Sequence, residues 1–425
     1  MDTNLELFRY IESCPTAYHA CGHTGEVLVS EGYEPLSEGE PWALIPGGKY
    51  FVRRNGSSLI AFRIPADGYL GFMLTASHGD SPCFKLRETP EMRDDKYTRL
   101  SAEKYGGMLC APWMDRPLSA AGRVTLRREN GIAVRLADLR EPVAVIPSVA
   151  IHMNRGANEN AAYNAAVDMV PLMGCPGEVS IREKLARTLD EKPENILSTD
   201  LFLYNPQSGV VMGDTISAPR LDDLQCAFGT LQGFLQAGEG KALPVYCLFD
   251  NEEVGSETKQ GAASTFLRDT LERIAAAFGK DLRELLPHSM MLSCDNAHAI
   301  HPNHPEYADK TDAPRINGGV VVKYNANQKY TTDGVSAALF TLLCERAGVP
   351  TQRYSNRPDL PGGSTLGSIA NTKVALPTVD IGLPQLAMHS AFETAGALDT
   401  DHLIRAARCF FESAVAPVED GFTLL

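Results

Sequence analysis

The chain has 425 residues, of which 44% are hydrophobic and 22% charged, a globular composition that argues against long disorder or a fibrous repeat. Lys and Arg number 39 against 53 Asp and Glu, giving a formal charge of −14, so neither nucleic acid nor an anionic membrane surface is an expected partner. The length predicts about two or three domains, with enough chain to bury a core without disulfides.

Cysteine usage and the N-terminal segment point to a reducing compartment. Ten cysteines are scattered without a C-x-x-C pair, which is typical of buried thiols. Residues 1–20 are acidic and amphipathic and lack the basic and apolar regions of a signal peptide. No apolar run approaches the roughly 18 residues of a membrane span. The sequence therefore predicts a soluble cytoplasmic protein.

Strand and helix signals alternate along most of the chain. Short apolar runs bounded by turn residues predict strands buried on both faces, at 71–77, 244–249, 289–293 and 374–381. Helical stretches are predicted at 221–237, 262–278, 333–347 and 401–414. This alternation predicts an α/β sandwich.

A central segment breaks the alternation. Residues 122–136 read as two alternating strands joined by Glu-Asn-Gly, a strong hairpin signal, and no long helical period follows until 179–189. We interpret residues 88–214 as an inserted β-rich domain, with 1–87 and 215–425 forming the α/β domain.

Polar side chains cluster where the predicted strands end. In open α/β sheets, ligands bind at the carboxyl ends of the strands. The residues that this rule singles out are His78, Asp80, Glu252, Glu253, Asp295 and His389, with Asp222 at the start of a helix. Any one of them alone is more simply explained as a turn acid or a core histidine. The argument for a site rests on four strand ends coinciding.

Nitrogen and carboxylate ligands without cysteine favour zinc, or manganese or cobalt. Two histidines and three carboxylates exceed one tetrahedral ion and suit two ions about 3.5–4 Å apart that share a bridging carboxylate. The adjacent Glu252 and Glu253 point in different directions, so one can ligate while the other acts as general base.

Other candidate motifs are weaker. His19 and His23 are four residues apart, but no Glu follows His19 as a metallopeptidase helix would need. Prolines interrupt a histidine tract, so we expect Asp295 to be the ligand there and the histidines to be structural; they are His298, His301 and His304. A Gly-Gly-Ser-Thr run without a P-loop lysine is assigned to holding a substrate carbonyl, through Gly363.

Six motifs in order carry a family resemblance. They are His-x-Asp-Ser-Pro, Arg-Leu-Asp, Asp-Asn-Glu-Glu-Val-Gly-Ser, Asp-x-Ala-His-Ala-x-His-Pro-Asn, Asn-Ala-Asn-Gln-x-Tyr and Met-His-Ser. Together they resemble the aspartyl aminopeptidase family of dinuclear zinc exopeptidases, over essentially the whole chain. The resemblance implies a three-layer sandwich peptidase domain with a zinc-exopeptidase-like sheet, interrupted by a dimerisation domain.

The resemblance also implies two zinc ions per subunit. His78 and Asp295 would bind one, Glu253 and His389 the other, and Asp222 would bridge them. Glu252 would be the general base, and Asp80 would hold His78 in its ligating orientation. Manganese or cobalt would also suit these ligands.

Substrate and assembly roles follow from the same resemblance. The substrates would be peptides with a free N-terminus. Lys323 matches a lysine that faces the first side chain of the substrate, where it would pair with Asp or Glu, and Tyr330 belongs to the same substrate site. His152, in the inserted domain, would reach the active site of a neighbouring subunit in a dodecamer built from homodimers.

The chain departs from the family pattern at Gly79, usually Thr, and at Ala391-Phe392, usually Ile-Arg, without losing a ligand. The sequence thus predicts a cytoplasmic dinuclear aminopeptidase that prefers N-terminal Asp or Glu. The alternatives are a broader or neutral-preferring aminopeptidase, a metal-dependent hydrolase of acylated amino acids, and a shell protein without catalysis.

Overall fold

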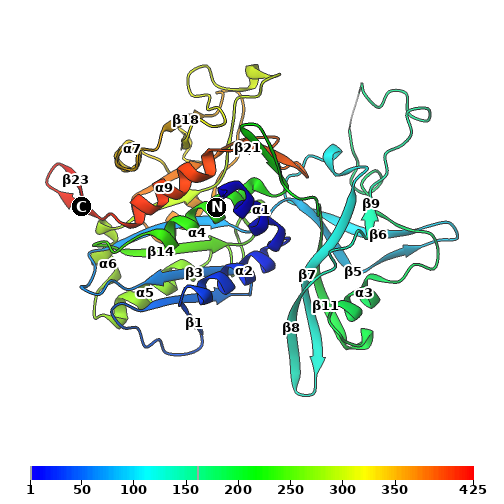
Figure 1. The fold of residues 1–425 in the computed structure, drawn as a ribbon, viewed down its shortest axis with the longest axis horizontal. Helices are drawn as coiled ribbons and strands as arrows, with labels where there is room; N and C mark the ends of the chain where they lie inside the picture. The colour runs from blue at the N-terminus through cyan, green and yellow to red at the C-terminus, as the bar shows by residue number, and fades with distance from the viewer. Residues whose placement is uncertain (1, 160–161) are drawn as a thin grey trace. The chain divides into compact units, whose positions relative to one another are not determined.

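The computed structural model describes residues 2–159 and 162–425, which form two compact units (Figure 1). The first unit runs up to Asp80 and resumes over Gly209–Met388 and Glu393–Leu425; the second comprises Ser81–Ser208 and His389–Phe392. The boundaries inferred from the sequence, at 88 and 215, lie several residues later. Strand β5 (Cys83–Arg93) already pairs within the second unit, and β12 (Val210–Met212) pairs within the first.

A nine-stranded sheet forms the centre of the first unit. Its order is β1 (Glu34–Leu36), β2 (Lys49–Arg54), β3 (Ser58–Arg63), β14 (Leu243–Phe249), β4 (Phe72–His78), β15 (Met290–Cys294), β19 (Thr378–Gly382), β17 (Val320–Tyr324) and β18 (Thr351–Ser355). Strands β14, β4, β15 and β19 are parallel, so their carboxyl ends share one edge.

Three of the predicted strands are confirmed as β4, β14 and β15. The prediction of the fourth strand, at 374–381, starts too early, because β19 begins only at Thr378. Pro377 stands directly before it and has no N–H to donate to a neighbouring strand.

Helices cover both faces of this sheet, so the first unit is a three-layer α/β sandwich, as the sequence predicted (Figure 1). One face carries α1 (Thr3–Ser13), α2 (Ala17–Ser30), α4 (Leu221–Gln236), α7 (Gly334–Ala347) and α9 (Asp399–Phe411). The other carries α5 (Phe266–Ala277), α6 (Leu282–Leu285) and α8 (Leu366–Asn371). The strands alternate between the two cores: in β14, Tyr246 packs on the first face and Val245 on the second.

Local sequence explains where α7 begins and ends. The Asp333 side chain accepts hydrogen bonds from the backbone N–H groups of Val335 and Ser336, and the Ser336 side chain completes a capping box. The helix ends at Gly348, whose φ of 63° is in the left-handed region that glycine tolerates.

Two smaller sheets complete the first unit. A five-stranded sheet has the order β12, β13 (Thr215–Ala218), β21 (Glu393–Gly396), β20 (Pro384–Leu386) and β16 (Ala297–His298). A C-terminal hairpin pairs β22 (Val415–Val418) with β23 (Gly421–Leu424).

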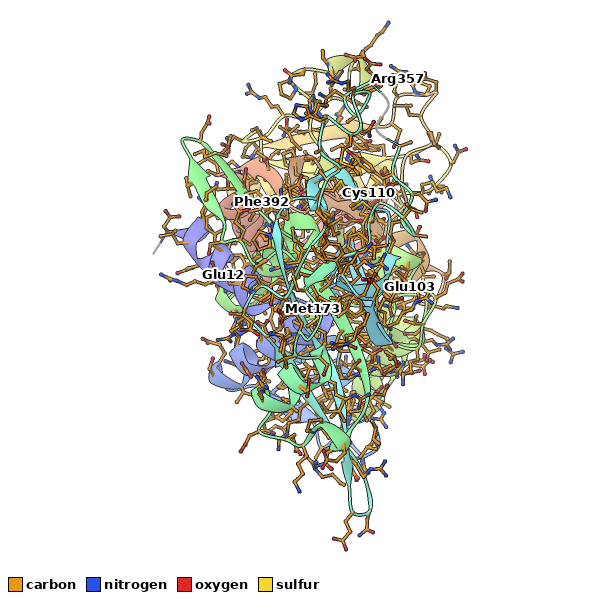
Figure 2. All side chains as sticks on the ribbon, turned by 90° about the vertical axis from the view of Figure 1, so that its right-hand side faces the viewer. Glu12, Glu103, Cys110, Met173, Arg357 and Phe392 are labelled. Atoms are coloured by element: carbon orange, nitrogen blue, oxygen red, sulfur yellow. The ribbon has the colours of Figure 1, made fainter. Side chains whose placement is uncertain are left out.

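The second unit contains a seven-stranded sheet. Its order is β11 (Ile196–Tyr204), β5, β6 (Thr98–Tyr105), β10 (Leu172–Gly174), β9 (Ala144–Val145), β7 (Pro117–Arg128) and β8 (Gly131–Asp138), and β11 also pairs with β7. Helix α3 (Ile181–Thr188) starts with a capping box between Ser180 and Glu183. The predicted hairpin is β7 and β8, which extends beyond the other strands of its sheet (Figures 1 and 2).

All ten cysteines are free thiols. Six are buried as predicted, but Cys175 is exposed and three are half-buried, namely Cys83, Cys110 and Cys409. Within the described residues, no helix is both long enough and apolar enough to cross a membrane.

Candidate metal centre

Strand ends and one helix start bring a histidine and three aspartates together in the first unit. His78 is the last residue of β4, Asp295 follows β15, and Asp222 and Asp223 open α4. Their ligand atoms all lie within 4.8 Å of one another, and all four side chains are buried. The sheet edge therefore assembles three of the predicted ligands, His78, Asp222 and Asp295, in one place.

The hydrogen bonds of His78 determine which ring nitrogen faces the cluster. Its Nδ1 lies 3.0 Å from the main-chain carbonyl of Asp80, which can only accept, so Nδ1 carries the proton. In the neutral imidazole, Nε2 carries the lone pair, and it lies 3.5 Å from Asp222 Oδ1 and 4.0 Å from Glu252 Oε2. This is the orientation that a histidine ligand to a metal requires.

The carboxylate of Asp80 has a second task. Its Oδ1 accepts from the backbone N–H of Glu252 at 3.2 Å, and its Oδ2 accepts from that of Glu253 at 3.1 Å. Asp80 thus contacts His78 chiefly through its carbonyl oxygen, while its carboxylate fixes the turn that carries both glutamates.

Glu252 and Glu253 lie in a short 3-10 turn, η3 (Glu252–Val254), directly after β14. Asn251, with φ of 63°, reverses the chain before the turn. Glu253 offers an oxygen within 4.8 Å of an oxygen of Asp222, whereas Glu252 approaches His78. The side chains of Glu252 and Glu253 therefore lie near different residues of the cluster.

Burial and crowding of like charges perturb these groups. Burial, with the neighbouring carboxyl groups, raises the pKa of Glu252 to about 8. Burial also raises the pKa of Asp295, although Lys323 opposes it. For His78, burial lowers the pKa, but the surrounding carboxyl groups, Asp222 first, outweigh it and raise the pKa. Several buried carboxyl groups thus place their oxygen atoms around one imidazole. A divalent cation bound among them would fit these ligands, because its charge would offset the repulsion between the carboxylates.

Sequence reasoning missed the function of Asp223. One of its carboxylate oxygens accepts from the backbone N–H of His78 at 3.3 Å, and the other from that of Asn296 at 3.2 Å. Asp223 therefore ties the ends of β4 and β15 together. The only signal in the sequence was its position beside Asp222. That position does not tell whether an aspartate binds a metal or accepts hydrogen bonds from the backbone.

A buried hydrogen-bond chain beneath the cluster was missed as well. Glu393 Oε2 accepts from the backbone N–H of Asp222 at 3.0 Å, and Glu393 Oε1 accepts from Gln385 at 3.4 Å. The Asn296 side chain in turn donates to the Gln385 carbonyl oxygen at 2.9 Å. This chain fixes the backbone that presents Asp222.

Lys323 is fully packed beside the cluster. Its side chain is 2% exposed, and Nζ donates to the carbonyl oxygens of Asp295 at 2.7 Å and Asn296 at 3.3 Å. Nζ also lies 5.2 Å from the ring centre of Tyr330, which is itself buried. Lysine is almost never fully buried unless its ammonium is paired, so the burial of Lys323 within β17 is an exception. Gly363, in contrast, is exposed in the loop between β18 and α8.

Two predicted site residues belong to the second unit. His389 Nδ1 lies 2.6 Å from the carbonyl oxygen of Gly107, so here too Nδ1 donates and Nε2 holds the lone pair. His152 lies in an exposed loop between β9 and β10. Their roles at the metal centre stay predictions.

The weaker histidine candidates take ordinary structural contacts. His19 Nδ1 lies 2.9 Å from Thr16 Oγ1, and the His23 ring packs 5.6 Å from that of Tyr10. His301 Nδ1 accepts from a backbone N–H at 3.2 Å, which leaves the proton on its Nε2.

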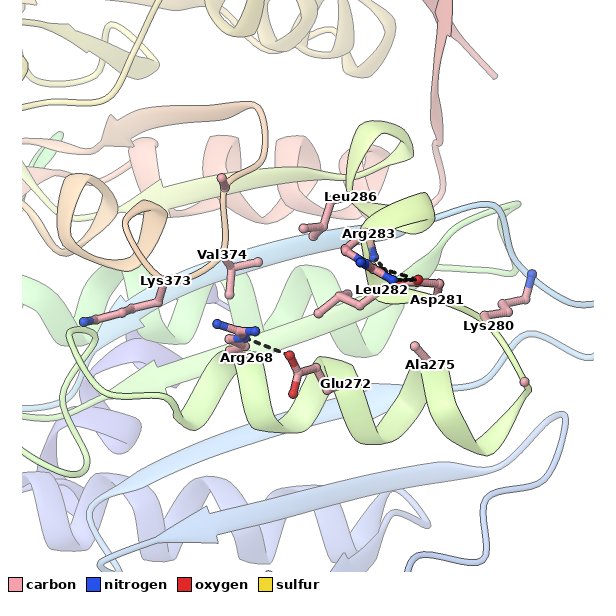
Figure 3. A pocket seen from close by; sticks show the side chains of 12 residues that line it. Arg268, Glu272, Ala275, Lys280, Asp281, Leu282, Arg283, Leu286, Lys373 and Val374 are labelled. Carbon is pink, nitrogen blue, oxygen red and sulfur yellow. Dashed lines mark hydrogen bonds and ion pairs between the residues drawn. The ribbon is translucent and has the colours of Figure 1, made fainter.

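A cavity of about 800 Å³ lies elsewhere in the first unit, beside α5 and α6 (Figure 3). Four of its charged side chains form two ion pairs, Arg268 with Glu272 at 2.8 Å and Arg283 with Asp281. Two lysines, Lys280 and Lys373, line it as well. Among the residues that the structure describes, the cavity lining contains no histidine, and each of its two carboxylates is paired with an arginine, so it offers no ligand set comparable to the metal centre.

A parallel sheet edge that buries histidine and carboxylates defines an α/β metalloenzyme. Residues 10–411 match the model of the family described as aminopeptidase I zinc metalloprotease (M18). A probable M18 family aminopeptidase 2 of Clostridium acetobutylicum is 42% identical over 411 residues, covering 93% of this chain and 95% of the relative. One of Azotobacter vinelandii is 38% identical over 430 residues, covering 98% and 99%.

Solved structures agree. A chain of the cryo-EM structure of the Ape4 and Nbr1 complex superposes with a TM-score of 0.92 at 32% identity, covering 96% of this chain and 85% of that chain. The crystal structure of prApe1 gives 0.91 at 29% identity, covering 96% and 94%. The chain belongs to the M18 family of zinc aminopeptidases.

Proposed function

We propose that the protein is a dinuclear metallo-aminopeptidase that removes the N-terminal residue of peptides, preferably Asp or Glu. The observation that carries this proposal is the buried cluster of His78, Asp222 and Asp295, with Glu252 beside it, in a member of a zinc aminopeptidase family.

Two zinc ions per subunit would share these ligands. His78 and Asp295 would bind one ion, Glu253 and His389 the other, and Asp222 would contact both. The closeness of Asp222 to His78 and to Glu253 supports a bridging role. Nitrogen and oxygen donors without cysteine would also accept manganese or cobalt.

Zinc bound here would polarise the scissile carbonyl and acidify the attacking water. Glu252 would accept the proton of that water on a carboxylate oxygen and pass it to the leaving amine. Asp80 keeps Glu252 in place through the backbone N–H of that residue, so the base stays on the His78 side of the cluster.

Lys323 would select the first side chain of the substrate. Its ammonium has three N–H donors, two of which are directed at the carbonyls of Asp295 and Asn296. The third would pair with a substrate carboxylate against the Tyr330 ring, and the backbone N–H of Gly363 would hold a substrate carbonyl.

We also propose self-association through the second unit. Its edge strand β8 exposes three apolar residues on one face, Ile132, Val134 and Leu136, a surface that monomeric proteins rarely leave to solvent. One structural neighbour, 28% identical with a TM-score of 0.84, is the mApe1 dodecamer. Homodimers would assemble into a dodecamer in the cytoplasm, with His152 reaching the site of a neighbouring subunit.

The test is hydrolysis of aspartyl-, glutamyl- and leucyl-anilides by the purified protein, with a chelator and then with zinc, manganese or cobalt restored. The expected result is metal-dependent release led by Asp and Glu, and no release from N-acetylated substrates. Lys323→Met should reduce the preference for acidic over leucyl substrates, whereas Lys329→Met, at an exposed position, should not. Metal-dependent release led by Leu would overturn the acidic preference, and hydrolysis of N-acetylated substrates would overturn the aminopeptidase proposal.

A further inference from the structure

A buried carboxyl group in β19 belongs to neither predicted ligand set. Asp380 has no exposed area, and its Oδ1 accepts from the Thr365 hydroxyl at 2.6 Å. Its Oδ2 accepts from the backbone N–H of Thr331. One carboxyl group therefore holds two segments that are more than thirty residues apart in the sequence.

Further hydrogen bonds fasten one of these segments to β19. The backbone N–H of Asp380 donates to the Thr332 hydroxyl at 2.9 Å, and the Thr331 hydroxyl donates to the carbonyl of Thr378 at 3.3 Å. Several hydrogen bonds thus fix the segment after Tyr330 to β19 before α7 begins.

The second segment packs just as closely. Gly367, in the first turn of α8, lies so near β19 that a Cβ there would meet Asp380 Oδ1 at 2.8 Å and Ser293 Oγ at 2.5 Å. Glycine at this position permits the Thr365 hydroxyl to reach the carboxyl group.

The two segments are the ends of the loops that carry the predicted substrate residues. Tyr330 immediately precedes Thr331, and its ring packs against Lys323 at 5.2 Å and against the Tyr354 ring at 6.3 Å. Gly363 stands two residues before Thr365. Any shift at Asp380 would therefore move Tyr330, which packs against Lys323, and Gly363, which is predicted to hold a substrate carbonyl.

We infer that Asp380 is a positioning residue for substrate selectivity: its buried carboxyl group holds the Tyr330 loop and the Gly363 loop in register without touching metal or substrate. This inference rests on the proposed function for its consequence in catalysis, but the loop tether itself can be measured without substrate.

Two variants and two controls separate the contributions. Thr365→Val removes one donor without changing side-chain volume, and Thr365→Ser restores the hydroxyl. Asp380→Asn weakens both contacts, because an uncharged amide no longer gives charge-assisted hydrogen bonds to the two donors and keeps only one acceptor oxygen. Thr341→Val removes a hydroxyl that donates within α7, away from both loops, at 2.8 Å.

In kinetics, Thr365→Val and Asp380→Asn should raise KM for aspartyl and glutamyl substrates about tenfold, a change of about 1.4 kcal/mol that matches one buried hydrogen bond. Zinc content and kcat on the leucyl substrate should stay within about twofold of wild type. Thr365→Ser and Thr341→Val should retain wild-type selectivity. Unchanged selectivity in Asp380→Asn, or an equal loss on all substrates with loss of zinc, would overturn the inference.

Amide hydrogen exchange tests the tether independently of activity. Thr365→Val should accelerate exchange in residues 357–366 only, and Asp380→Asn should accelerate it also in 326–333. If the wild-type protein released no residue from any substrate, the proposed function would fail while this exchange pattern still decided the tether. Faster exchange throughout the first unit, or none in either loop, would overturn it.

Discussion

Replacing Asp80 with asparagine tests whether a residue that ligates no metal controls the metal centre. In the structure, the two Asp80 oxygens accept from the backbone N–H groups of Glu252 and Glu253 at 3.2 and 3.1 Å. Asparagine has one acceptor oxygen, so one of these N–H groups would face an NH2 donor instead. The side-chain volume is almost unchanged, and the main-chain carbonyl that orients His78 stays in place.

The magnitude follows from the lost contact. A hydrogen bond to a charged group contributes about 1.5–3 kcal/mol, so a loss of about 2 kcal/mol is expected at this turn. If the whole loss is expressed in the transition state, kcat/KM falls about 30-fold. Because the same turn carries the predicted ligand Glu253, zinc affinity should fall by about 10–100-fold, as is usual for residues that support ligands.

The assay combines kinetics at saturating zinc with competition against a chromophoric chelator. Asp67→Asn is the matched control, since Asp67 is exposed in the same unit. Asp80→Asn with zinc affinity and kcat/KM within about twofold of wild type would refute the argument that this carboxylate positions the glutamates.

Three further results are expected. Glu252→Gln should keep its zinc but lose about 10²–10⁴-fold in kcat, which is the contribution of a general base. The control Glu257→Gln, at an exposed position, should stay active. A fully active Glu252→Gln would exclude Glu252 as the general base. Burial raises the pKa of Asp250 to about 7, so between about pH 4 and 7 the folded state holds a proton that the unfolded state has lost. The free energy of unfolding should therefore fall by up to about 4 kcal/mol as the pH rises through this range. In urea unfolding of the metal-free protein, Asp250→Asn should flatten this pH dependence, and an unchanged pH dependence would contradict the raised pKa. Chelation should abolish activity and lower Tm, and zinc at about 100 times its Kd should restore about 2.7 kcal/mol, whereas a Tm indifferent to zinc would argue against a site in the folded state.

The layered fold was predictable because its strands are short apolar runs with clear ends. The N-terminal strands β1 and β2 gave no such signal, since β1 is only three residues long and β2 carries charged residues at both ends. Strand β3 does contain a short apolar run, which the prediction overlooked. Pairing direction was also out of reach. Strand β3 runs antiparallel to β14, which depends on tertiary contacts rather than on local pattern.

The departure at Gly79 also has a physical explanation that only the structure supplies. A Cβ at this position would lie 3.2 Å from the Ala20 side chain and 3.5 Å from that of Leu248. A threonine there would press α2 away from the strand end, so the glycine accommodates the close packing beside His78.

The candidate ligands could be proposed from the sequence because strand ends concentrate them, but their division of labour could not. Asp80 and Asp223 are aspartates that are buried to much the same degree as Asp222 and Asp295. What distinguishes the first two is that both of their oxygens accept backbone N–H groups, from the turn at Glu252 and from two strand ends. A carboxylate engaged in this way holds the chain that presents the predicted ligands Asp222 and Asp295. The geometry of the metal centre therefore depends on the hydrogen-bonded backbone as well as on the predicted ligands. For this reason, substitutions at Asp80 and Asp223 should weaken metal binding without removing a single ligand atom.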